Sequence, residues 1–96
     1  MLRRLIVSVV GGRGIAEVRK RHLAALAHEV EAHGLSWRLT GPGESLLSVS
    51  GPGARRQLMV VATPSGEGWS YLWPGGGMAD VAEVADVAER LARLLA

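Results

Sequence analysis

Residues 35–73 read LSWRLTGPGESLLSVSGPGARRQLMVVATPSGEGWSYLW, and this stretch determines the predicted fold. Leu35, Trp37 and Leu39 alternate with polar residues, which is the pattern of a half-buried strand. Gly-Pro-Gly occurs at residues 41–43 and again at 51–53, with proline and glycine where a type II turn needs them. We therefore expect an antiparallel meander of four strands, at residues 35–40, 45–50, 57–63 and 69–73, which ends at Pro74 and the glycines 75–77.

A helix is predicted on each side of this meander. Apolar residues recur on one face of residues 15–33, and Gly34 follows where a left-handed C-terminal cap is expected. The closing helix has Asp80 as N-cap and Glu83 as its capping-box partner. It carries one apolar stripe, made of Val81, Val84, Ala88, Leu91 and Leu95. The predicted fold class is therefore α+β, with both helices packed on one face of the sheet.

The N-terminal segment is harder to place. Residues 5–10, LIVSVV, are rich in β-branched residues and predict a strand, followed by a loop of Gly11, Gly12, Arg13 and Gly14. Residues 1–14 are thus an extra N-terminal strand, a helix extension or a loose arm. The 96 residues suit one domain, spanning positions 1–96.

Composition excludes several classes of function. Apolar residues make up 48% of the chain and charged residues 21%, which is typical of a globular protein. There is no cysteine, so disulfides, thiolate metal sites and a cysteine nucleophile are excluded. The longest N-terminal apolar run, residues 5–10, is too short for a membrane span or a usual signal peptide. We expect a cytoplasmic protein with no membrane partner.

No motif indicates catalysis, a cofactor or a metal. The Gly11–Gly14 loop lacks the third glycine of a dinucleotide-binding fingerprint, because Glu occupies position 17. The histidines at 22, 28 and 33 are not spaced by four residues, as paired metal ligands on a helix would be. We therefore expect no catalytic residues, no cofactor and no metal site, and the chain is predicted not to be an enzyme.

Two neighbouring strands carry the candidate partner contacts. The strand at residues 57–63 is apolar on both faces, so a sheet covered on one side would expose Met59 and Val61. Either the N-terminal segment or a second copy of the chain must cover them, and we favour a homodimer. The strand at residues 69–73 puts three aromatic rings on one face, suited either to a partner surface or to the core. The predicted contacts are Met59, Val61, Trp69, Tyr71 and Trp73.

Basic residues form a second candidate surface. Residues 1–38 carry seven basic groups against three acids, and the predicted anion contacts are Arg13, Arg19, Lys20 and Arg21. Either these side chains form a solvated helix face, or they bind nucleic-acid phosphates. The helix–strands–helix order of residues 15–96 resembles a double-stranded-RNA-binding domain, in which lysines at the start of the last helix grip phosphate. Asp80 and Glu83 occupy that turn here, which argues against this function.

A broader resemblance concerns the layout of the whole chain. An N-terminal helix, a tryptophan-containing meander and a C-terminal Ala/Leu helix are similar to those of small uncharacterised proteins of high-GC bacteria. The layout also resembles, loosely, small dimeric secretion chaperones, which implies binding of an extended partner segment. We therefore predict a non-catalytic accessory protein that binds a protein or peptide partner as a homodimer. The alternative is a nucleic-acid-binding regulator that uses the basic first helix.

Overall fold

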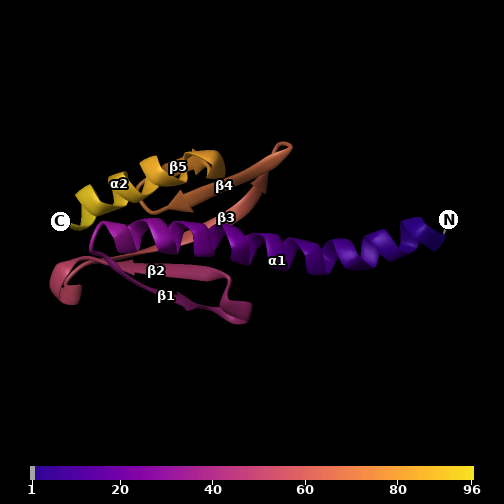
Figure 1. The fold of residues 1–96 in the computed structure, drawn as a ribbon, viewed down its shortest axis with the longest axis horizontal. Coiled ribbons are helices and arrows are strands. Elements are labelled where there is room, and N and C mark those ends of the chain that lie inside the picture. The colour runs from indigo at the N-terminus through magenta and orange to yellow at the C-terminus, as the bar shows by residue number, and fades with distance from the viewer. Residues whose placement is uncertain (1) are drawn as a thin grey trace.

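The protein consists of a long helix, a five-stranded antiparallel meander and a short helix, in that order along the chain (Figure 1). The computed structural model describes the backbone of residues 2–96 and the side chains of residues 14–53 and 55–96. The elements are α1 (Leu2–Ala32), β1 (Ser36–Thr40), β2 (Leu46–Ser50), β3 (Gln57–Ser65), β4 (Gly68–Trp73), β5 (Gly77–Asp80) and α2 (Val84–Leu95). The predicted α+β class is confirmed, with five strands in place of four.

The register of the meander separates two faces of the sheet. Leu47 pairs with Val60, and Ala62 pairs with Tyr71, which in turn pairs with Ala79. All five of these side chains are buried, in one cluster with buried residues of α1 and α2. We call this the inner face. Both helices pack on it and against each other, as predicted (Figure 1).

The fifth strand corrects the prediction that the sheet ends at Pro74 and its glycines. Gly75 and Gly76 adopt φ of +91° and +82°, left-handed conformations that glycine adopts without strain. They reverse the chain tightly, and β5 pairs antiparallel with β4 from Trp73 opposite Gly77 onward. Gly77 also has to be glycine for a packing reason, because a Cβ there would approach the Trp73 indole within 2.0 Å.

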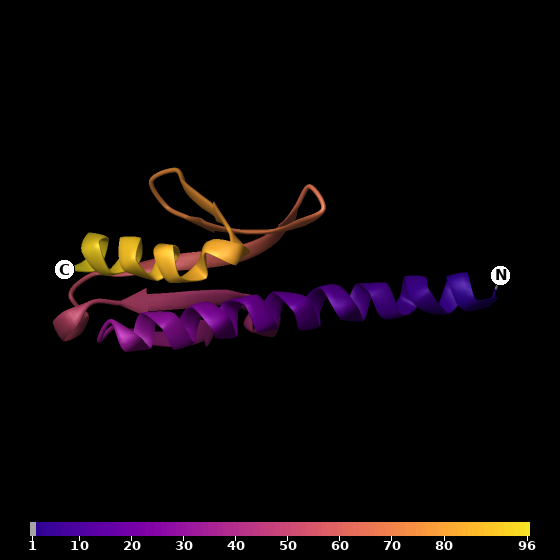
Figure 2. The same ribbon diagram turned by 45° about the horizontal axis from the view of Figure 1, so that its top comes forward.

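The N-terminal segment is helical. The predicted strand at residues 5–10 and the loop at 11–14 are both part of the continuous helix α1, Leu2–Ala32. A strand satisfies its backbone groups only by pairing with a neighbour, whereas a helix satisfies them within itself. The N-terminal part of α1 extends past the sheet, and the molecule is 53 Å long but 23 by 22 Å in cross-section (Figures 1 and 2).

The second half of α1 is the part that packs on the sheet. Its buried residues are Leu23, Leu26, Ala27 and Val30, whereas Ile15 is 46% exposed. The helix ends as predicted at Gly34, whose φ is +77°. The N–H groups of Leu35 and Gly34 bond the carbonyls of Val30 and Glu31, which is the Schellman pattern.

The α2 end of the domain follows the sequence closely. The Asp80 carboxylate accepts a hydrogen bond of 2.8 Å from the N–H of Ala82, so Asp80 is the predicted cap. A short 3-10 turn at Val81–Glu83 leads into α2, which buries Val87, Ala88, Leu91 and Leu95. None of the helices in the described part of the chain combines the length and the apolarity that a membrane crossing requires.

Candidate functional site

The outer face of the sheet, opposite the helices, carries a row of partly exposed apolar side chains. Val61 pairs with Leu72, and Leu72 pairs with Met78, so these three side chains form a row across β3, β4 and β5. Met59 lies two residues from Val61 on the same face of β3. Met59 is 38% exposed and Met78 63% exposed, while Val61 and Leu72 are half-buried. We call these four residues the outer apolar row.

The five predicted partner contacts lie on different faces. Met59 and Val61 belong to the outer face, because the paired register separates them from the buried inner residues. Trp69, Tyr71 and Trp73 point to the inner face, where Tyr71 is fully buried and Trp73 is 7% exposed. The aromatic strand is therefore core, which was the second interpretation of its sequence. Trp69 is half-buried at the edge of that core.

A polar cluster surrounds Trp69 where α1 crosses the sheet. The Arg19 guanidinium lies 5.5 Å from the Trp69 ring centroid, and its Nε donates to the Ala62 carbonyl at 3.0 Å. The His22 ring lies 5.3 Å from the Trp69 ring. Burial, with the nearby Arg21 charge, lowers the pKa of His22 below 6.5, and Asp80 opposes this effect. The cluster fastens α1 to β3 and β4.

The predicted basic surface is divided by these contacts. Arg19 is turned into the sheet, and the Lys20 ammonium lies 3.7 Å from the carboxylate of Glu44. Arg21 is exposed. The side chain of Arg13 lies outside the described side chains. Consecutive helical residues point about 100° apart, so these three described cations do not share one face.

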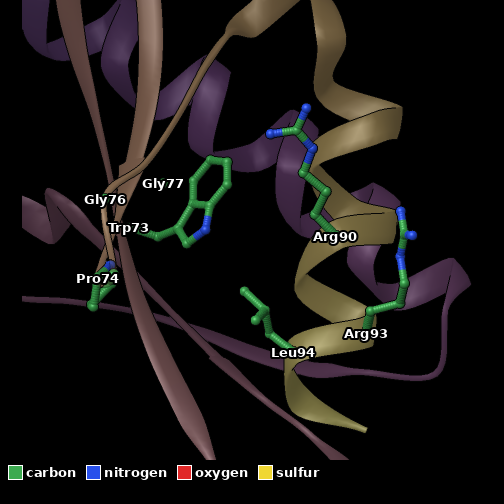
Figure 3. A pocket seen from close by; sticks show the side chains of 8 residues that line it. Trp73, Pro74, Gly76, Gly77, Arg90, Arg93 and Leu94 are labelled. Carbon is green, nitrogen blue, oxygen red and sulfur yellow. The ribbon is translucent and has the colours of Figure 1, made fainter.

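A cavity of about 520 Å³ lies between the β4–β5 turn and α2 (Figure 3). Trp73 and Leu94 form its apolar surface, and the turn at 74–77 forms one side. Arg90 and Arg93 of α2 lie on the other side, paired with Asp86 at 3.0 Å and Glu89 at 2.9 Å. Each ion pair joins residues four positions apart on one helix, whereas the cavity exists only because the β5 hairpin, which the sequence did not predict, stands beside α2.

Metal binding has little support in this arrangement. Among the described side chains, no three His, Asp or Glu residues gather closely enough to hold a metal ion.

Comparison with family models, with curated proteins and with solved structures found no match for this chain. The resemblance to secretion chaperones therefore stays a similarity of layout.

Proposed function

We propose that this protein is a non-catalytic accessory protein that forms a homodimer through the outer face of its sheet and binds a protein or peptide partner. The observation that carries the proposal is the outer apolar row: Met59, Val61, Leu72 and Met78 adjoin one another on a face that neither α1 nor α2, as far as the structure describes them, covers. Soluble proteins rarely leave such a patch without a partner.

A second copy of the chain fits this face better than the chain's own N-terminal segment. That segment is the first part of α1, which extends past the sheet, while the second half of the same helix packs on the inner face. The centre of the outer face is uncharged, so two copies meet there without repulsion. Arg38 in β1 and Asp80 in β5 lie at opposite edges of the sheet with opposite charges. A two-fold axis parallel to the strands brings the β1 edge of each copy against the β5 edge of the other, so that edges of opposite charge meet.

The size of the face predicts a weak dimer. Five strands at a spacing of about 4.8 Å make it about 19 Å wide, and five residues per strand make it about 17 Å long. The flat area is then about 320 Å², below the roughly 800 Å² per partner of a standard interface. The accessible surface is larger than this flat area, because side chains project from the sheet. We therefore expect dissociation in the micromolar range, so the mass should depend on concentration.

The test is the solution mass, measured by light scattering or sedimentation over a range of concentrations. The wild-type mass should approach that of two chains as concentration rises. Met59→Asp together with Met78→Asp should hold it at one chain, and both side chains are exposed enough for the fold to tolerate the change. Ile15→Asp is the matched control, because Ile15 is a similarly exposed apolar residue on α1. A wild-type monomer at every concentration, or a double variant that still dimerises, would contradict the proposal.

A further inference from the structure

The cavity beside α2 combines an apolar surface with unused hydrogen-bond donors. Its volume of about 520 Å³ lies within the roughly 300–1,000 Å³ usual for small-ligand sites, although it is a shallow depression open to solvent and not an enclosed cavity. Figure 3 shows the Trp73 indole on one side, Leu94 projecting toward it from α2, and the arginine side chains rising from the same helix. The outer apolar row lies on the opposite face of the sheet.

The first donor is the indole N–H of Trp73. The side chain is only 7% exposed, and no hydrogen-bond acceptor is found for its N–H among the described residues. No fully buried side-chain nitrogen or oxygen in the described part of the chain is left without a partner, so this N–H retains some solvent exposure, and Trp73 lines the pocket. The indole ring packs directly against the backbone of Gly77, and this contact holds the ring in its position beside the cavity.

The second and third donors are the guanidinium groups of Arg90 and Arg93. The Nε of Arg90 lies 3.0 Å from the carboxylate of Asp86. Glu89 engages Arg93 through one terminal nitrogen. Both are exposed i,i+4 pairs, which hold an arginine only weakly. An incoming anion can therefore share these guanidiniums without displacing a strong interaction.

We propose that this cavity binds a carboxylate carried on an apolar group, and specifically the C-terminal residue of a peptide partner. The carboxylate accepts from Arg90 and the Trp73 indole, with Arg93 at the rim, while the apolar side chain lies against Leu94 and Pro74. Arginine binds carboxylates through two parallel hydrogen bonds, and the apolar surface selects against inorganic anions. This proposal rests on the proposed binding of a peptide partner and specifies where the peptide binds. It does not involve the outer apolar row, so an experiment can disprove the peptide site without disproving the dimer, and the reverse.

The test uses four probes: a five-residue peptide ending in leucine, the same peptide with an amidated C-terminus, N-acetyl-leucine, and N-acetyl-leucinamide. Binding is followed by NMR through the indole N–H signal of Trp73, one of three in the chain. We expect the free acids to shift this signal and the amides to leave it unchanged. The peptide acid binding more tightly than N-acetyl-leucine identifies a peptide terminus, and the reverse order would overturn that source.

Arginine substitutions locate the site. Arg90→Gln should weaken binding of the peptide acid about five- to tenfold, since a charge-assisted contact is lost, and Arg93→Gln by less. Arg21→Gln is the control, because it removes one positive charge from exposed α1 without touching the cavity. Equal binding of acids and amides, an equal loss in Arg21→Gln, or no shift of the Trp73 signal by any acid would each overturn the site. Because the readout is a local signal, it is unaffected by whether the chain is monomeric or dimeric.

Discussion

Alkaline pH acts on one identifiable group in the core of this protein. Tyr71 is its single tyrosine, and the side chain is completely buried between the sheet and α1. Its hydroxyl donates to the carbonyl oxygen of His22 at 2.5 Å. Burial raises the pKa of Tyr71 from 10.0 to about 12, because the phenolate would lose its hydration. The pH at which Tyr71 ionises therefore reports how well the packing of α1 on the sheet excludes water from this side chain.

The magnitude follows from the difference between the folded and unfolded pKa values. Between pH 10 and about 12 the unfolded chain has released a proton that the folded chain still holds. The free energy of unfolding therefore falls as pH rises through this window, and the contribution is fully present below pH 10. A difference of two pKa units (12 − 10) corresponds to about 2.7 kcal/mol. That is a large fraction of the roughly 5–15 kcal/mol that stabilises a typical domain.

Two measurements check this result. The ultraviolet absorbance of tyrosinate should show a midpoint near 12 in the folded protein, with no second tyrosine to obscure it. Urea unfolding below pH 10 and near pH 12 should show the loss of stability in the wild type. Tyr71→Phe should lose about 1 kcal/mol at neutral pH and should lack the tyrosine part of the alkaline loss. A tyrosinate midpoint near 10 in the folded protein, or an equal alkaline loss in Tyr71→Phe, would refute the reasoning.

Two further predictions concern packing and the response to acid. Gly77→Ala should destabilise the fold by about 1–3 kcal/mol, because its Cβ would lie 2.0 Å from the Trp73 indole. Gly68→Ala, with only a 4.0 Å contact, is the matched control, and equal urea midpoints for the two variants would contradict the packing. The pKa of His22, lowered by burial and by Arg21, means that the unfolded chain binds a proton first as pH falls below 6.5. This part of the stability is present above pH 6.5 and lost below it, and an NMR titration midpoint for His22 at or above 6.5 would disprove this.

Local chemistry was sufficient to predict the regular elements of the meander and of α2. Alternating residues and the two Gly-Pro-Gly turns identify β1 to β4, and Gly43 and Gly53 do adopt positive φ. Asp80 caps the turn that leads into α2, as predicted, and the two ion pairs on that helix join residues four positions apart. These features depend on residues only a few positions apart, so sequence spacing carries them directly.

Non-local packing decided the elements that were missed. Three consecutive glycines are typical of a loop, yet Gly77 begins β5 because its bare backbone accommodates the indole of Trp73. The β-branched run at residues 5–10 has strand propensity, but it continues α1 because neither sheet edge pairs with it. Strand propensity is weak beside the need to pair every backbone group.

The candidate sites show the same division. The sequence alone determined that residues 58–62 of β3 are apolar on both faces, and it predicted that both helices pack on only one of them. Only the tertiary structure decided that Met59 and Val61 are continuous with Leu72 and Met78, while Tyr71 and Trp73 face the other way. Likewise, the spacing of Arg90 and Arg93 places them on one helix, but only the position of the β4–β5 hairpin makes them line a cavity with Trp73. The physical reason is that a strand or helix fixes which side chains share a face, whereas a site forms between elements that lie far apart in the sequence.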